Sequence, residues 1–533
     1  MTAASRQPAP EHGGERHAGL VVFAGLVFLI GLAARLRAAA FPAFELFRSF
    51  PTEDGYLMLT VARNLALGRG MTSAAGTMPT NGVQPLATLL QAVCFWLVGG
   101  DRATGVRLVI IVYAAVAAVT CVLVYRLGLV LLGATAPGRW AALLAAAAWF
   151  SSPLTLSQSM NMLETGLYTA AVLLVALFFA RGHAVGGPWP PSRCLALGGL
   201  LGLAFWVRND AVLLMAAVGL AHLAARRDGP TLRRRAAETA GIAVGAAAIS
   251  LPWLVHNLRG FGSVMPLSGY AHLRAGDVGA NLRAAAVALF EQLAVVVSFE
   301  FSPAQQSALF AAAGAAGFAA AAALVIRRRT WEPGARAVAL AAAIFGGGLL
   351  GFYVFLFDAP YFVRRYLFPL SPLLALAWGT VAYGLWRRLD ASRVRLGGPV
   401  LAALLLANFL VRDGFMVRGP WRGGALFRNV DWVEGHVTAD TWVGAFQSGT
   451  LGFFHDRTIN LDGKVNPEAL RAIRERRHQA YVVESPIQFV VDWETILEPW
   501  SQSDASLRRH FEWVLRDPVD NFAVLGRRAA AAP

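Results

Sequence analysis

Two adjacent acidic residues, Glu53 and Asp54, are the first side chains in the sequence that could do chemistry. They lie in the segment FPTEDGYLMLTVARNLALGRG, where a helical pattern covers Tyr56 to Ala66. One carboxylate could face a cavity and remove a proton from an acceptor hydroxyl. Acids also suit the first turn of an interfacial helix, where they favour the positive end of the helix dipole. Spacing alone favours this structural interpretation.

Two other charged sites interrupt apolar sequence. Glu164, in SMNMLETGLY, precedes an apolar run, where an acid could serve only to start a helix. Arg208, Asn209 and Asp210 break another apolar stretch. A charge at membrane depth costs roughly 2.5–3.5 kcal/mol, so such residues mark a functional site or neutralise each other. The sequence leaves both interpretations open.

The elements that must position these residues are mostly membrane-spanning. Of 533 residues, 56% are hydrophobic and 15% are charged, and the mean hydropathy is +0.51. A soluble domain carries about 25% charged residues. Runs of roughly 17–25 apolar residues can cross a bilayer, and the sequence predicts about 11 such spans. They fall near 18–39, 105–125, 138–156, 165–181, 195–207, 211–225, 236–255, 304–326, 335–357, 366–386 and 396–412.

Arginine-rich loops set the predicted orientation. These loops carry Arg126 and Arg139; Arg181 and Arg193; Arg226, Arg227 and Arg233 to Arg235; Arg327 to Arg329 and Arg336; and Arg387, Arg388, Arg393 and Arg395. They lie two spans apart, so the positive-inside rule makes them cytoplasmic, together with the tail 1–17. This clustering also explains the net charge of +15 without a nucleic-acid partner. Abundant Ala and Arg suggest a GC-rich bacterial genome.

The segment 84–99 decides which face receives loop 40–104. It is short and carries Gln84, Pro85 and Gln91, so it is predicted to lie in the interface without crossing. Loop 40–104, the turn 157–164, the Arg208 region and the mouth at 358–365 then lie outside the cytoplasm. Arg364 and Arg365, in DAPYFVRRYLFPL, lie on that outer face against the orientation rule. They are expected to hold an anion, with lipid headgroups as the alternative.

The last part of the chain, 413–533, has ordinary charge density and is predicted to be a small soluble α/β domain on the outer face. A strand is expected at Ala480 to Glu484, a helix around Pro467 to Arg477, and a turn at Asp462-Gly463. The three cysteines have no metal-ligand spacing, and the sequence has no phosphate-binding loop and no HExxH motif. These absences argue against a nucleotide-driven pump. The first apolar run is expected to be a retained anchor.

Several stretches together resemble the polytopic GT-C glycosyltransferases that use polyprenyl-phosphate sugars, in particular the bacterial family-39-like and arabinofuranosyl- or mannosyltransferase-like branch. In chain order they are EDGYLMLTVARNLALGRGMT with PTNGVQPL, SMNMLETGLY, GLLGLAFWVRNDAVLL, PWLVHNLRGFGSVMPLSGYA, RRYLFPLSPLLAL and GTLGFFHDRTINLDGKVNP. The resemblance covers nearly the whole chain. It implies a transmembrane catalytic module over 18–412. The chain departs from the best-known branches because it lacks a paired-proline element and a WWDYG signature, which leaves the acceptor open.

The resemblance implies roles for particular residues. It makes Asp54, paired with Glu53, the catalytic base, and it makes Glu164 a supporting acid or, in some members, a metal ligand. The donor phosphate is expected at the arginines and the substrate at the first loop; the residues concerned are Arg208, Arg364 and Arg365 for the phosphate, and Asn81 and Gln84 for the substrate. No metal ligand is assigned, although a divalent metal is left open.

The implied activity is transfer of a single hexose or pentose from a polyprenyl-phosphate donor, by inverting displacement, to an extracytoplasmic glycan, lipid or protein. The site would face the periplasm from the bacterial inner membrane. The alternative is a polytopic transporter or flippase-like protein for cell-envelope glycolipids. A transporter should show inverted repeats and ionisable residues within broken spans, and only Arg208-Asn209-Asp210 hints at this. The large outer loop and the soluble tail favour the transferase.

Overall fold

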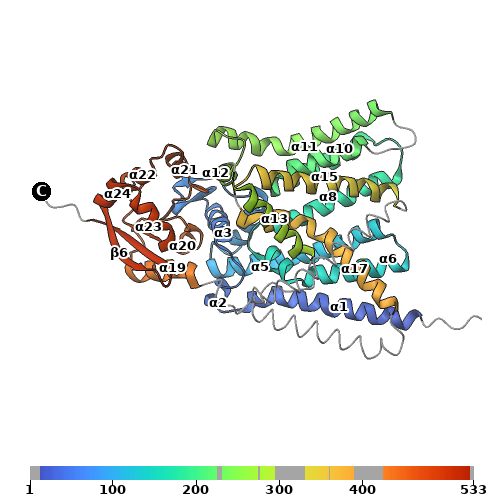
Figure 1. Ribbon diagram of the computed structural model, residues 1–533, viewed down its shortest axis with the longest axis horizontal. Helices are drawn as coiled ribbons and strands as arrows, with labels where there is room; N and C mark the ends of the chain where they lie inside the picture. Colours follow the sequence, from blue (N-terminus) through green and yellow to red (C-terminus); the bar gives the residue numbers. More distant parts are fainter. Residues whose placement is uncertain are drawn as a thin grey trace, which may run out of the picture.

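The computed structural model describes residues 13–224, 231–273, 276–293, 331–358, 360–388 and 424–528. Long helices run roughly along the long axis of the molecule, and a smaller sheet domain sits at one end of them (Figure 1). The predicted spans 304–326 and 396–412 lie outside the described residues. The protein therefore divides into a helical bundle and a C-terminal α/β domain, as the sequence predicted.

The bundle is built from helices with apolar surfaces. They are α1 (Gly13–Arg37), α5 (Arg102–Leu132), α6 (Ala136–Ser151), α7 (Pro153–Met160), α8 (Thr165–Val185), α9 (Pro191–Val207), α10 (Ala211–Ala224), α11 (Leu232–Phe261), α13 (Val278–Leu293), α15 (Pro333–Phe355) and α17 (Ser371–Arg388). Within the described ranges, five helices are long and apolar enough to cross a membrane, and a sixth span results if α6 and α7, bent by 60°, count as one. The predicted all-α polytopic architecture is confirmed, while the number of 11 spans stays a prediction.

Glycines allow close helix packing in the bundle between α9 and α11. A Cβ atom on Gly198 would lie 2.2 Å from the carbonyl oxygen of Ile242, and one on Gly202 would lie 2.5 Å from Cβ of Ile249. Small residues are the usual means by which membrane helices approach closely. This packing fixes the end of α9, where the chain turns at Arg208.

The first loop folds into short elements at one end of the bundle. They are α2 (Ala43–Phe47), α3 (Glu53–Ala66), the strand pair β1 (Thr72–Ser73) and β2 (Met78–Pro79), and α4 (Pro85–Trp96). The predicted helix after the acidic pair is thus confirmed as α3. Both flanks of α4 touch the C-terminal domain, because Gly82 packs against the carbonyl group of Lys464 and Arg102 donates to Phe453 O at 2.7 Å. The 12-residue helix α4 therefore begins and ends at the same end of the bundle and does not cross it.

Buried hydrogen bonds explain the polar residue within α4. Gln91 Nε2 donates to Tyr113 Oη at 2.7 Å and to Met162 O at 2.8 Å. The side chain is fully buried against the bundle. The opposite face of α4 exposes Leu89, Val93 and Trp96. This amphipathic arrangement agrees with a helix that lies in the membrane interface.

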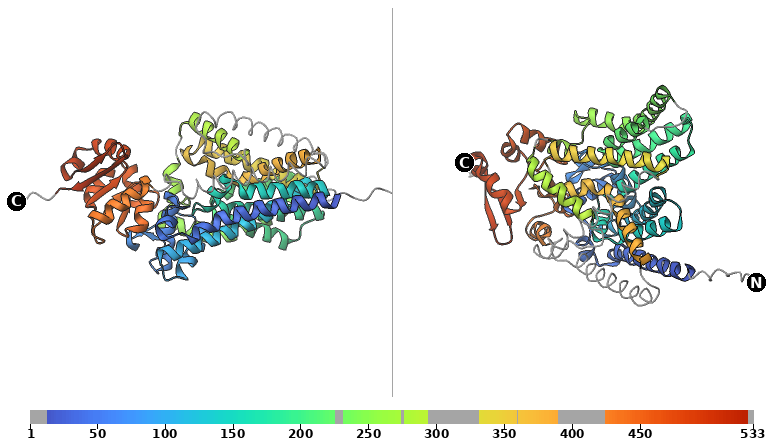
Figure 2. Two further views of the ribbon diagram at one scale, coloured as in Figure 1. Left: turned by 90° about the horizontal axis from the view of Figure 1, so that it is seen from below. Right: turned by 45° about the vertical axis from the view of Figure 1, so that its right-hand side comes forward.

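The C-terminal domain is a five-stranded mixed sheet with helices around it (Figure 2). The strands are β3 (Val443–Ala445), β4 (Thr458–Asn460), β5 (Phe489–Asp492), β6 (Phe511–Asp517) and β7 (Phe522–Arg527), in the order β4-β3-β5-β7-β6. Pairs β4-β3 and β3-β5 are parallel, and pairs β5-β7 and β7-β6 are antiparallel. The helices are α19 (Gly424–His436), α20 (Ser448–Phe454), α21 (Pro467–Arg474), α22 (His478–Glu484), α23 (Glu494–Gln502) and α24 (Ala505–His510).

Two local predictions in this domain have different outcomes. The helix predicted around Pro467 to Arg477 is confirmed as α21, whereas the strand predicted at Ala480 to Glu484 is wrong because these residues lie in the helix α22. The guanidinium group of Arg527 donates to the carbonyl oxygens of Val482 and Val483, which satisfies the end of this helix. The two adjacent valines are thus helical because of a contact with a residue distant in sequence, although their intrinsic propensity favours a strand.

The predicted grouping of outer segments agrees with the structure. Thr52 of the first loop donates to Asn161 O in the second at 3.2 Å, and Glu53 accepts hydrogen bonds from α20 of the C-terminal domain. The beginning of α1, the end of α10 and the start of α11 lie at the far end (Figure 1). Among the described residues, the arginines at the start of α11, Arg233 to Arg235, and the acidic pair therefore occupy opposite ends of the bundle. Two further short helices, α12 (Leu267–His272) and α16 (Val363–Leu367), lie at the acidic end.

Candidate active site

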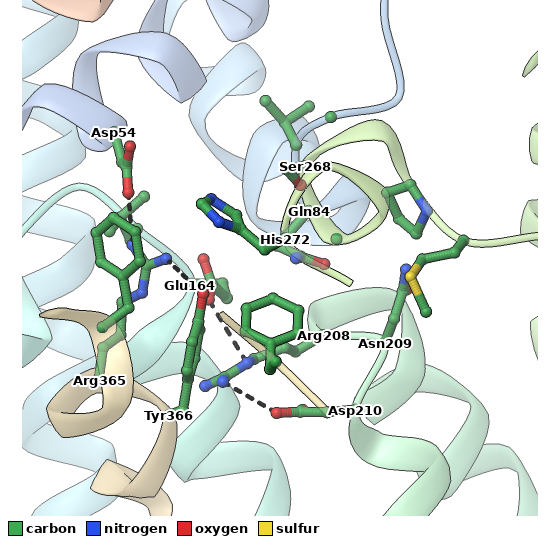
Figure 3. A pocket seen from close by; sticks show the side chains of 18 of the residues that line it. Asp54, Gln84, Glu164, Arg208, Asn209, Asp210, Ser268, His272, Arg365 and Tyr366 are labelled. Atoms are coloured by element: carbon green, nitrogen blue, oxygen red, sulfur yellow. Dashed lines mark hydrogen bonds and ion pairs between the residues drawn. The ribbon is translucent and has the colours of Figure 1, made fainter. Parts of the chain in front are cut away.

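A cavity of about 230 Å³ lies where the bundle, the first loop and the C-terminal domain meet (Figure 3). Six charged side chains line it: Asp54, Glu164, Arg208, Asp210, Arg365 and Lys464. Another part of the wall is apolar and includes Leu213, Phe352 and Phe357. The cavity can therefore accommodate a molecule with a charged group and a hydrocarbon part.

The position of Asp54 follows from the start of α3. Thr52 is the N-cap, and its Oγ1 accepts from Gly55 N at 3.2 Å while donating to Asn161 O at 3.2 Å. A Cβ atom on Gly55 would lie 2.4 Å from the same carbonyl oxygen. The absence of a side chain at Gly55 therefore lets α3 pack against the second outer loop, and Asp54 is directed into the cavity.

Asp54 is held by two cations from distant parts of the chain. Its Oδ2 lies 3.1 Å from Nη1 of Arg365, and its Oδ1 lies 3.6 Å from Nζ of Lys464. Burial raises the pKa of Asp54, but the charges of Lys464 and Arg365 outweigh it and keep the pKa below its usual value. Asp54 is therefore an ionised carboxylate in an ion-pair network.

Glu53 faces away from this cavity. Its carboxylate accepts hydrogen bonds from Gly449 N, from Thr450 N at 3.0 Å and from Thr450 Oγ1 at 2.6 Å. Burial raises the pKa of Glu53, against the lowering effect of these hydrogen bonds. A Cβ atom on Gly449 would lie 2.0 Å from Glu53 O. The two adjacent acids thus have different surroundings, and Glu53 joins the first loop to the C-terminal domain.

Arg208 is buried among carboxylates and aromatic rings. Its Nη2 lies 2.9 Å from Asp210 Oδ2, and its Nε lies 3.8 Å from Glu164 Oε1. The hydroxyl of Tyr353 donates to Asp210 at 2.7 Å. The ring of Tyr366 lies beneath the guanidinium group, 4.7 Å from it. The predicted neutralisation of Arg208 by Asp210 is present, and Glu164 belongs to the same cluster.

The structure brings together five of the eight residues proposed from the sequence. The residues lining the cavity are Asp54, Gln84, Glu164, Arg208 and Arg365. Arg364 pairs instead with Glu291 of α13. Asn81 is buried beside the cavity, where its Nδ2 donates to Asn257 Oδ1 at 2.9 Å and its Oδ1 accepts from Leu267 N at 3.1 Å. Asn81 therefore ties the first loop to α11 and α12.

Lys464 is a charged residue of the cavity that sequence reasoning missed. It follows the predicted turn, in which Gly463 has a φ of +80°, and its Nζ also lies 3.1 Å from Asp462 Oδ2. A signal was available, because Lys464 is the only lysine among 47 lysine and arginine residues. His272 also lines the cavity. Burial, followed by the charge of Lys464, lowers the pKa of His272.

The residues of the cavity do not fit a divalent metal ion. In the part of the chain that the structure describes, no three His, Cys, Asp or Glu side chains form a group that could hold one. The carboxylates of Asp54, Glu164 and Asp210 are each within ion-pair distance of a guanidinium or ammonium group. A divalent ion would have to bind next to these cations, which repel it.

Comparison with known proteins gives a fold. No curated protein sequence matches the chain. A family described as a domain of unknown function (DUF8728) matches residues 421–527, which contain the C-terminal sheet.

Solved structures match almost the whole chain. ArnT from Cupriavidus metallidurans, bound to undecaprenyl phosphate, is similar with a TM-score of 0.57 and 14% identity over 96% of this chain and 99% of that one. The oligosaccharyltransferase AglB from Archaeoglobus fulgidus, in complex with an inhibitory peptide and a dolichol-phosphate, has a TM-score of 0.55 and 11% identity over 98% of this chain and 75% of that one. At these identities the similarity establishes the fold alone.

Proposed function

We propose, from the GT-C fold that these comparisons establish, that the protein is a membrane glycosyltransferase using a polyprenyl-phosphate sugar. One observation carries the proposal. A partly buried, ionised carboxylate, Asp54, and a guanidinium group, Arg365, meet in a cavity that also has an apolar wall. A base for an acceptor hydroxyl and a cation for a departing phosphate are the two groups that this transfer needs.

The donor phosphate is assigned to Arg365. Within the described ranges, Nε of Arg365 is buried and has no hydrogen-bond partner, and an unsatisfied buried donor costs free energy unless a ligand supplies an acceptor. Leu213, Phe352 and Phe357 offer an apolar surface for the first isoprene units. ArnT was solved with undecaprenyl phosphate and AglB with a dolichol-phosphate, which supports a donor of this class.

The proposed reaction is a single displacement. Asp54 accepts the proton of an acceptor hydroxyl while the oxygen of that hydroxyl attacks the anomeric carbon of the donor sugar. The bond from that carbon to the phosphate oxygen breaks, and the polyprenyl phosphate leaves with the electron pair. A phosphate is a good leaving group, so no strong general acid is required. One displacement inverts the anomeric configuration, whichever hexose or pentose is transferred.

The site is proposed to face the periplasm from the bacterial inner membrane, with a glycan, a lipid or a protein as acceptor. In the described part of the chain, the arginine-bearing start of α11 lies at the end of the bundle away from the cavity, and the positive-inside rule supports a cytoplasmic position for that end. Lys464 and Glu53 link the cavity to the C-terminal domain. A transport pathway would not require this domain to enclose the site.

The experiment uses full-length protein in lipid nanodiscs with radiolabelled polyprenyl-phosphate hexoses and pentoses. Wild type should release polyprenyl phosphate as it forms a glycosylated product, and Asp54→Asn should slow the transfer by about 10²–10⁴-fold, the usual contribution of a positioned base. Asp440→Asn is the matched control, because that side chain is 88% exposed and distant from the cavity. A wild-type rate in Asp54→Asn contradicts the base assignment. Passage of intact donor across vesicles without transfer would indicate the transporter.

A further inference from the structure

We infer that the C-terminal domain completes the donor site through Lys464, and that an anionic donor frees Asp54 by taking over its two cations. This inference rests on the proposed function. In the structure, Arg365 and Lys464 both bind Asp54. The carboxylate and a donor phosphate would therefore compete for the same two groups.

The composition of the chain makes Lys464 unusual. The other 46 members of the Lys and Arg set are arginine, including those in every basic loop of the bundle. An arginine presents a planar fork, whereas a lysine presents a compact ammonium group with three donors on a flexible stem. Nζ of Lys464 lies between two carboxylates, 3.1 Å from Asp462 and 3.6 Å from Asp54. A mobile point charge suits a cation that must change partners.

Close backbone contacts fix Lys464 at the cavity. A Cβ atom on Gly82 would lie 1.9 Å from Lys464 O, and one on Gly449 would lie 2.0 Å from Glu53 O. The first loop and the C-terminal domain therefore interlock on both sides of Asp54. Lys464 N also donates to Asp462 Oδ1 at 2.9 Å, which holds the turn. The backbone of Lys464 is held in place while the end of its side chain can rotate.

The exchange of partners explains how a carboxylate between two cations can act as a base. While it is paired, Asp54 has a depressed pKa and is a weak proton acceptor. A bound phosphodiester shares the charge of Arg365 and Lys464, and Asp54 then accepts a proton more readily. In the displacement, the hydroxyl proton passes to Asp54, and the departing phosphate gains one negative charge. That charge lies beside Arg365 and Lys464, which no longer form ion pairs with Asp54 once its carboxylate is protonated.

Binding of undecaprenyl phosphate to three variants in nanodiscs tests this competition. Lys464→Met should bind it roughly 10- to 100-fold more weakly than wild type, the size of a charge-assisted hydrogen bond. Asp54→Asn should bind it more tightly, by about threefold or more, because the competing carboxylate is gone. Arg509→Met, an exposed change in the same domain, should bind like wild type. Lys464→Arg keeps the charge and should bind more tightly than Lys464→Met.

The two substitutions should change the affinity for undecaprenyl phosphate in opposite directions, which distinguishes this inference from a merely structural role of Lys464. If Lys464 only ties two carboxylates together, Lys464→Met and Asp54→Asn should both weaken binding, and that result would overturn the inference. Equal binding by wild type and Lys464→Met would overturn it as well. If wild type itself does not bind undecaprenyl phosphate, the proposed function fails at its donor. Thermal unfolding of each variant checks that the domain remains folded.

Discussion

The contact between α20 and the first loop allows a sharp test, because two glycines of one short helix differ only in what lies above them. Gly449→Ala places a methyl group 2.0 Å from the backbone oxygen of Glu53, whereas Gly452→Ala places one 3.7 Å from the nearest atom, Cβ of Thr458. Each change alone should stabilise a helix by roughly 0.5–1 kcal/mol. Only the first creates an overlap.

The size of the effect follows from these distances. A backbone oxygen cannot rotate away, so Gly449→Ala must move the C-terminal domain or α3. Overpacking of this kind costs about 1–3 kcal/mol, which exceeds the gain in helix propensity. A loss of one or two kcal/mol corresponds to about a 5- to 30-fold increase in the fraction of molecules in which the C-terminal domain is not docked on the first loop. Gly452→Ala should leave that population unchanged or reduce it.

Hydrogen–deuterium exchange of the full chain measures this opening directly. The amides of Gly449 and Thr450 donate to Glu53, so their exchange reports whether the domain is docked. We expect faster exchange of the Thr450 amide in Gly449→Ala and no acceleration in Gly452→Ala. Equal exchange in the two variants would refute the close contact on which the placement of Lys464 depends.

Two further predictions concern buried charges. Arg208→Met leaves the buried carboxylates of Glu164 and Asp210 without their cation, so it should destabilise the protein by about 3–5 kcal/mol. Arg457→Met, whose partner Asp440 is exposed, should cost less than about 1 kcal/mol in the same thermal unfolding assay. His478 accepts a hydrogen bond from Trp500 Nε1, and burial lowers its pKa from 6.5 to about 4. The unfolded chain therefore binds a proton first as the pH falls, and this histidine by itself should contribute a loss of about 3 kcal/mol in the stability of the C-terminal domain between pH 6.5 and pH 4. His478→Gln should lack this dependence when exchange of β5 amides is followed over that range, and an unchanged pH dependence would contradict the assignment.

Features that depend on local sequence could be predicted. The apolar helices follow from the cost of placing polar groups in hydrocarbon, and the length and polar residues of segment 84–99 allowed the prediction that it does not cross the bundle. The helix at α3 follows from its periodicity. The strand at Ala480 to Glu484 failed because the end of α22 is satisfied by Arg527, a residue 45 positions away from Val482.

Roles that depend on long-range contacts could not be predicted. Glu53 and Asp54 are neighbours in sequence, but successive side chains of a helix point about 100° apart, so one meets Thr450 and the other meets Arg365. The same geometry separates Arg364, which pairs with Glu291, from Arg365. Hydropathy and charge patterns cannot reveal which member of such a pair faces the cavity.

The distribution of charge around the cavity refines where a phosphate should bind. Arg208 is the only cation within ion-pair distance of Glu164 and Asp210 in the described chain, so that cluster carries one more negative than positive charge. Around Asp54, two carboxylates and two cations balance, since Lys464 also pairs with Asp462. An added anion is therefore repelled less by the cluster around Asp54 than by the cluster around Arg208. In the described chain, Arg365 of the Asp54 cluster also has a buried Nε without a hydrogen-bond partner. Arg208, a phosphate candidate from sequence, is therefore better suited to be the counter-ion of Glu164, and we propose that Arg365 with Lys464 receives the donor phosphate.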